Sequence, residues 1–148
     1  MISAKSVKDR LKNKSVISGK TFQDALIAYG LERTVYRLSI SEYVDRFTLK
    51  GGIFLYALFD GEFSRATRDI DLLAMNLPNT IEDIKTVFEK IFSIGCDDAL
   101  QYDLCTLEVK NITEFKEYHG VNVSVIAYLD KTKVPISIDI GFGDVVYP

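Results

Sequence analysis

A glycine turn, followed about one helix later by two closely spaced aspartates, constrains the fold of this chain more than any other feature. Lys50, Gly51 and Gly52 form the turn, which comes after a short apolar run at 47–49 and before an apolar segment at 53–59. Glycine lets the backbone approach an anion closely, and the first turn of a helix presents N–H groups that lack intrahelical partners. The pattern predicts a strand, a phosphate-binding turn and a buried helix, in that order.

The two aspartates, Asp69 and Asp71, lie on either side of Ile70 and are followed by Leu72. Residues i and i+2 of a strand point to the same face, so the two carboxylates can converge on one or two divalent cations. The alternative is a pair of solvated loop carboxylates. The apolar neighbours favour the metal-binding interpretation, because a carboxylate beside a core is costly unless it is paired or metal-bound.

A third carboxylate, Asp139, stands in a strand-like segment near the end of the sequence. Ile136, Ile138 and Ile140 alternate with Ser137 and Asp139, which predicts a strand with one polar face. On that face, Asp139 is a candidate to receive the proton of an attacking hydroxyl or to bind a second metal ion. The alternative is an edge strand on which Asp139 merely faces water.

The remaining periodicities predict an α+β architecture, in which N-terminal helices precede a mixed β-sheet with flanking helices and the three acids share one face. Helices are expected at 3–13, 21–38 and 81–92, and strands at 106–110, 121–129 and 136–140, with a turn at 130–133. Ser3 and Thr80 have the side chains that cap helix N-termini, and we expect them to begin the first and third helices.

Length and charge exclude several classes of protein. A chain of 148 residues is expected to form one domain, spanning 1–148. No apolar run approaches the roughly 20 residues that cross a bilayer, and the N-terminus lacks the apolar stretch of a secretory signal. We therefore expect a cytoplasmic protein without a membrane partner. Cys96 and Cys105 lack metal-site spacing and are expected to be reduced thiols in the core or in loops.

A net charge of −3 argues against binding of nucleic acid through the overall electrostatic field. Basic residues do gather near the N-terminus. They form either an RNA-facing patch or, as we prefer, a solvated helix face: Lys5, Lys8, Arg10, Lys12, Lys14 and Lys20.

Taken together, four ordered motifs resemble those of the AbiEii/AbiGii-type nucleotidyltransferases, which are toxin components of abortive-infection toxin–antitoxin pairs within the polymerase-beta-like superfamily. The motifs lie at 31–39, 47–52, 65–72 and 138–144. The resemblance implies a nucleotidyltransferase-like fold. Many superfamily members have Gly-Ser where this chain has Gly51 and Gly52. Family members usually continue into a helical C-terminal region, so the chain is expected to be the N-terminal catalytic portion and a poor transferase alone.

The resemblance also implies roles for the candidate residues. Asp69, Asp71 and Asp139 would be catalytic and would bind Mg²⁺ at a two-metal site, with Asp139 activating the acceptor hydroxyl. Nucleoside triphosphate, the substrate, would be bound by the glycine turn and its flanking cations: Lys50, Gly51, Gly52 and Arg68. For Lys50, a position facing solvent is the alternative. For Arg68 and the nearby Arg65, the alternative is an ion pair with Asp60 or Glu62.

The implied function is transfer of a nucleotide to a hydroxyl group of RNA, with the 3′ end of tRNA as one candidate, or to a hydroxyl group of a protein. The residues do not choose between these acceptors. RNA contact would come through the absent C-terminal region, and a cognate antitoxin would be the protein partner. The alternative is a module on the same fold that binds nucleotide or metal, or docks the antitoxin, without turnover.

Overall fold

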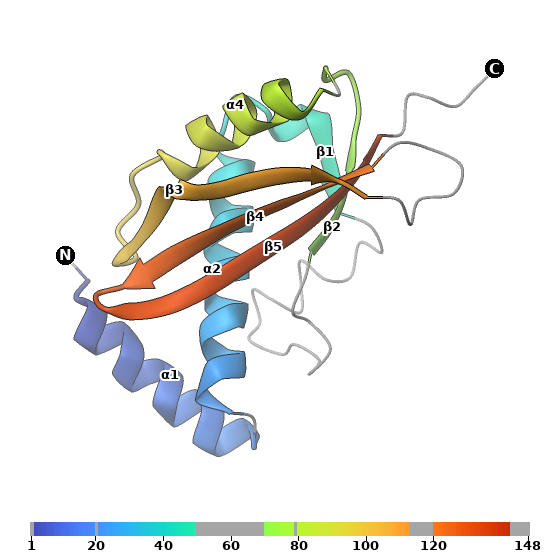
Figure 1. Ribbon diagram of the computed structural model, residues 1–148. Helices are drawn as coiled ribbons and strands as arrows, with labels where there is room; N and C mark the ends of the chain where they lie inside the picture. The colour runs from blue at the N-terminus through green and yellow to red at the C-terminus, as the bar shows by residue number, and fades with distance from the viewer. Residues whose placement is uncertain (1, 20, 50–69, 79, 113–119, 143–148) are drawn as a thin grey trace.

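The computed structural model describes residues 2–19, 21–49, 70–78, 80–112 and 120–142. Within them, the elements follow one another in the order α1 (Ala4–Ser18), α2 (Phe22–Ser39), the 3-10 helix η1 (Val44–Arg46), β1 (Phe47–Leu49), β2 (Ile70–Ala74), α4 (Ile81–Phe92), β3 (Leu100–Asn111), β4 (Gly120–Leu129) and β5 (Thr132–Phe142). The expected α+β architecture, with helices preceding and flanking a mixed sheet, is confirmed (Figure 1).

The five described strands form one sheet in the order β1-β2-β5-β4-β3. The pair β2 and β5 is parallel, whereas the other three pairs are antiparallel. Strands β4 and β5 form a hairpin in which Leu129 is opposite Thr132, and Asp130 in the turn has φ 57°. Aspartate tolerates this left-handed conformation better than most residues, so the predicted turn is confirmed with its chemical reason.

One face of the sheet carries the apolar core. Along β5, Ile136, Ile138 and Ile140 are buried, and α2 packs on this side of the sheet, behind β4 and β5 in Figure 1. The helix comes close because Gly30 has no side chain: a Cβ there would lie 2.7 Å from Cγ1 of Val134. Hydrophobic burial on this single face decides which way every strand side chain points.

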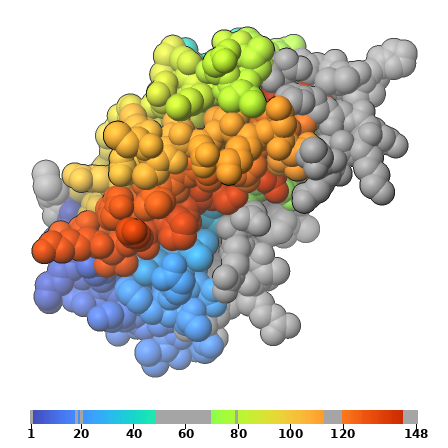
Figure 2. Space-filling view, viewed as in Figure 1, coloured from blue at the N-terminus to red at the C-terminus, as the bar shows by residue number. Residues whose placement is uncertain are grey.

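The other face of the sheet is more polar. Alternate residues of the central strands, including Asn122, Ser124 and Tyr128 on β4 and Ser137 on β5, are only half-buried. Figure 2 shows atoms of β3, β4 and β5 at the molecular surface between α4 and the α1–α2 pair. We call this side the polar face. It is the face on which the sequence pattern placed the candidate acids.

Helix caps follow the sequence, whereas some element ends do not. Ser3 and Thr80 accept hydrogen bonds from the backbone N–H groups of Ser6 and Asp83, as expected for N-caps. Helix α1 continues past the expected end and stops at Gly19, whose φ of 76° suits glycine.

Strand β3 begins at Leu100 rather than at 106. Its ladder with β4 has an irregularity between Asp103 and Glu108, which interrupts the alternation that would have revealed the first half of the strand. Cys105 lies exposed on this strand, and Cys96 is half-buried before it, both as free thiols. None of the helices in the described ranges is long and apolar enough to cross a membrane.

Candidate active site

Asp71 and Asp139 lie directly opposite one another on the neighbouring parallel strands β2 and β5. Asp71 is exposed and Asp139 is half-buried, whereas their strand neighbours Ile70 and Ile138 are buried. Because paired residues on adjacent strands project to the same side, and strands lie about 4.8 Å apart, both carboxylates occupy the polar face at the same level. For these two acids, the expectation that they share one face of the sheet is confirmed.

Packing of the opposite face determines this register. Ile70 is opposite Ile138, and Leu72 is opposite Ile140, so the residues that flank both aspartates enter the core together. A slip of one residue would exchange the two faces of the strand and bury a carboxylate among isoleucines. The apolar residues of β2 and β5 therefore hold the acids in place.

A residue that the sequence analysis did not single out completes this constellation. Asn122 on β4 is opposite Asp139 on β5. Its Nδ2 donates a hydrogen bond of 2.8 Å to Oδ1 of Asp139 and one of 2.8 Å to Oγ of Ser137. The sequence did contain a signal for this contact. Asn122 alternates with Val121 and Val123, which places it on the polar face. Pairing β4 with β5 residue by residue from their turn would have placed it opposite Asp139.

The other expected site residues lie outside the described part of the chain. These are Lys50, Gly51, Gly52, Arg68 and Asp69. The predicted helix at 53–59 also lies there. The described residues contain no group of three or more His, Cys, Asp or Glu side chains placed to hold a metal ion. They do supply two facing carboxylates, and carboxylate oxygen is the ligand type that Mg²⁺ prefers, so the donor chemistry fits this ion.

A depression of about 390 Å³ lies along β3, β4 and β5, and neither Asp71 nor Asp139 is among its lining residues. Glu108, Ser124 and Ser137 contribute to its lining, and Ser137 is also the second acceptor of the Asn122 amide. Ser137 is therefore shared by the depression and the hydrogen-bonded group around Asp139. More than half of the lining residues are apolar, among them Ile27, Val125 and Ile136, so the depression combines hydroxyl and carboxylate groups with hydrophobic surface.

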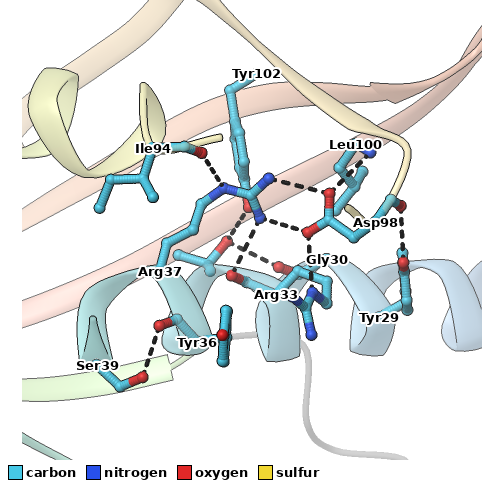
Figure 3. Close-up of polar contacts among 11 residues, drawn as sticks. Tyr29, Gly30, Arg33, Tyr36, Arg37, Ser39, Ile94, Asp98, Leu100 and Tyr102 are labelled. Carbon is cyan, nitrogen blue, oxygen red and sulfur yellow. Dashed lines mark hydrogen bonds and ion pairs between the residues drawn. The ribbon is translucent and has the colours of Figure 1, made fainter. Parts of the chain in front are cut away.

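A second polar cluster lies among α2, the segment after α4 and β3 (Figure 3). Arg37, only 2% exposed, forms a bidentate pair with Asp98: Nη1 is 2.7 Å from Oδ2 and Nη2 is 3.0 Å from Oδ1. Arg33 Nε adds a bond of 2.9 Å to Oδ2, and the backbone N–H of Leu100 donates to Oδ1 at 3.1 Å. Four donors thus converge on one buried carboxylate.

The environment of Asp98 keeps it ionised. Burial raises the pKa of this carboxyl, but the hydrogen bonds from Arg37 and Arg33 outweigh burial and hold the pKa below its usual range. Arg37 also donates from Nε to the carbonyl oxygen of Ile94 and lies over the ring of Tyr102 at 4.8 Å. The cluster links α2 to the chain on both sides of Asp98, which is a structural role. Arg37 belongs to the first of the four family-like motifs, 31–39, but its pairing with Asp98 was not foreseen.

Comparison with known proteins identifies the family of this chain. A comparison with curated proteins finds no match. A family model described as "Nucleotidyl transferase AbiEii toxin, Type IV TA system" matches residues 33–148. The match includes β2, β4 and β5, the three strands that bring Asp71, Asn122 and Asp139 together, and it covers most of the chain. The resemblance drawn from the motifs is thereby confirmed: this chain belongs to the AbiEii family of nucleotidyl transferase toxins of type IV toxin–antitoxin systems.

Proposed function

We propose that this protein is a metal-dependent nucleotidyltransferase that transfers a nucleotide from a nucleoside triphosphate to a hydroxyl group of RNA. The observation that carries the proposal is the side-by-side placement of Asp71 and Asp139 on parallel strands in a member of this family. Two neighbouring carboxylates repel one another, so placing them side by side on the polar face does not stabilise the fold. Their placement therefore favours a role in binding a cation over a purely structural one.

In this proposal, Asp71 and Asp139, together with Asp69, hold Mg²⁺, which when bound neutralises charge on the triphosphate and on the departing pyrophosphate. Asp139 also accepts the proton of the acceptor hydroxyl. The hydroxyl oxygen forms a bond to the α-phosphorus, the bond from that phosphorus to the bridging oxygen breaks, and pyrophosphate leaves. The glycine turn of Gly51 and Gly52, with Lys50 and Arg68, is proposed to bind the phosphates.

We take the basic residues of α1 as an RNA-facing patch, rather than as the solvated helix face preferred from the sequence alone, because the chain belongs to a nucleotidyl transferase family. This helix carries five basic residues and one acid, Asp9, although the whole chain has a net charge of −3. The basic residues are exposed except for Lys8, which is half-buried: Lys5, Lys8, Arg10, Lys12 and Lys14. Phosphate backbones are attracted to such a local concentration of positive charge even when the overall charge is negative. Membership of a toxin–antitoxin family adds a cognate antitoxin as the expected protein partner.

Incorporation of radiolabelled nucleotide into total tRNA tests the proposal. The protein is assayed with all four nucleoside triphosphates and Mg²⁺, beside Asp71→Ala and Asp139→Ala. Tyr128→Phe, on the same face of β4, is the matched control. We expect transfer that either aspartate substitution abolishes and the control retains. Absence of transfer by the protein, with protein acceptors also tried, would instead support a binding module without turnover.

A further inference from the structure

We propose that Asn122 is a positioning residue, which fixes the carboxylate of Asp139 in the orientation needed beside Asp71. This inference rests on the proposed function, because it gives Asn122 a role toward the metal and the acceptor hydroxyl. Its basis is the hydrogen bond of 2.8 Å between Nδ2 of Asn122 and Oδ1 of Asp139. In the sheet, Asp139 is flanked by Asn122 on β4 and by Asp71 on β2.

The orientation of the Asn122 amide is chemically determined. Its Nδ2 lies near three oxygens: Oδ1 of Asp139 at 2.8 Å, Oγ of Ser137 at 2.8 Å and the backbone carbonyl of Ile138 at 3.4 Å. An ionised carboxylate and a backbone carbonyl can only accept hydrogen bonds. A flipped amide would turn its own oxygen toward them and repel both. Nδ2 must therefore face β5.

This contact restrains Asp139 without neutralising it. By bridging Ser137 and Asp139, which are two residues apart on the same face of β5, the amide limits rotation of the carboxylate. A neutral amide supplies a donor but no positive charge, so the negative charge of Asp139 stays available to a cation. An arginine in the same place would compete with the cation. Hydrogen-bond partners of metal ligands commonly act in this way.

Binding of Mn²⁺, an ion that can replace Mg²⁺ and is visible by electron paramagnetic resonance, tests the inference without requiring turnover. The variant is Asn122→Leu, which keeps the approximate volume and removes the donor. Tyr128→Phe is the matched control, on the same strand and face. Removal of a partner of this kind typically costs about 10- to 100-fold in metal affinity. We expect at least about a tenfold loss for Asn122→Leu and less than about a twofold change for the control.

Kinetics separate positioning from a general structural effect. In the transfer assay, Asn122→Leu should lower kcat by a similar factor. The KM for nucleoside triphosphate should stay within about twofold of the unmodified protein, because the glycine turn is untouched. A variant that binds Mn²⁺ as tightly as the unmodified protein and keeps its kcat would overturn the role of Asn122 while leaving the proposed function standing. Absence of any Asp71-dependent Mn²⁺ binding would overturn both.

A measurement on the unmodified protein covers the case in which the leucine variant does not fold. The side-chain amide of Asn122 gives its own ¹H–¹⁵N resonance, and Mg²⁺ added to the protein should shift it through Asp139. Asn13, on the exposed surface of α1, is the internal reference and should not shift. An Asn122 resonance that is as insensitive to Mg²⁺ as that of Asn13 would contradict the proposal.

Discussion

Asp98 and Asp139 are both aspartates held by hydrogen bonds, but their surroundings differ in kind. Asp98 is buried and receives four donors, three of them from the guanidinium groups of Arg33 and Arg37. Asp139 is half-buried, receives the neutral amide of Asn122 and has a second carboxylate, Asp71, as its strand neighbour. A carboxylate offers about four acceptor positions, so Asp98 is saturated.

The difference separates a structural carboxylate from a functional candidate. A saturated, charge-paired carboxylate holds chain segments together, because removing any partner leaves a buried charge uncompensated. A carboxylate that has a neutral donor and an acidic neighbour contributes less to the free energy of folding. Because no cation among the described residues is paired with it, its negative charge can bind a cationic ligand. Substituting the same residue type at the two positions should therefore give opposite results for stability and for activity.

The largest effect on stability is expected from Asp98→Asn. The substitution leaves the guanidinium of Arg37, 2% exposed, without its counter-charge. Loss of one partner of a buried pair costs about 3–5 kcal/mol, and we expect a decrease of that size in the free energy of unfolding. Urea unfolding measures this decrease. For comparison, Asp139→Asn should lower the free energy of unfolding by less than about 1 kcal/mol, since an asparagine oxygen still accepts the hydrogen bond from Asn122. Equal losses at both positions would remove the distinction.

The largest effect on activity is expected from the other region. Asp71→Ala and Asp139→Ala should each lower the rate of nucleotide transfer by at least about 100-fold, because electrostatic stabilisation of the charge that develops at the reacting phosphate accelerates such reactions by this order of magnitude. In metal-free buffer Asp71→Ala should be at least as stable as the unmodified protein, because it removes one of two neighbouring negative charges. Addition of a chelator should abolish transfer by the unmodified protein without unfolding it, and thermal melting with and without chelator checks this.

The pH dependence of stability sharpens the comparison further. The pKa of Asp98 is lower in the folded protein than in the unfolded chain, where aspartate titrates near 3.9. Its stabilising contribution is thus fully present above about pH 3.9 and is lost as the pH falls through the folded-state pKa. The difference in free energy of unfolding between the unmodified protein and Asp98→Asn should therefore decrease below pH 4. Unfolding curves at several pH values between 3 and 7 measure this difference. A difference that stays constant would contradict the lowered pKa of Asp98.

A smaller effect is expected from Tyr29, whose hydroxyl donates to the backbone carbonyl of Asp98 at 2.8 Å. Tyr29→Phe should lower the free energy of unfolding by about 1 kcal/mol. Burial, reinforced by the charge of Asp98, raises the pKa of Tyr29 to about 12. Its contribution is therefore present below pH 10 and lost as the pH rises toward 12, so the variant should show less alkaline destabilisation. The free energies of unfolding of Tyr29→Phe and the unmodified protein, measured at pH 7 and above pH 10, test this expectation.

The smallest effect is expected at the exposed pair of Lys5 and Asp9, whose Nζ and Oδ2 atoms are 3.4 Å apart on α1. Both side chains are more than half exposed, so solvent screens their attraction. Lys5→Ala should change the free energy of unfolding by at most about 1 kcal/mol, in contrast to Asp98→Asn. A loss comparable to that of the buried pair would show that α1 depends on this contact.

Much of the architecture could be predicted from local patterns. The amphipathic period of α2, the caps Ser3 and Thr80, and the alternation around Ile138 identified the elements and the directions of their side chains. These signals are local, because each depends on residues within one or two turns or strand repeats. The long β3 was only half predicted, since its irregular pairing with β4 breaks the alternation.

The sequence by itself determined which residues share a face, and so marked Asp71 and Asp139 as polar residues of apolar strands. Only the tertiary structure decided that β2 lies parallel to β5, that Asn122 reaches Asp139, and that Arg37 meets Asp98 from 61 positions away. Periodicity specifies the direction of a side chain but not its neighbour. The neighbours were selected when the whole apolar face was buried at once, which aligns strands far apart in the chain and leaves their polar residues side by side.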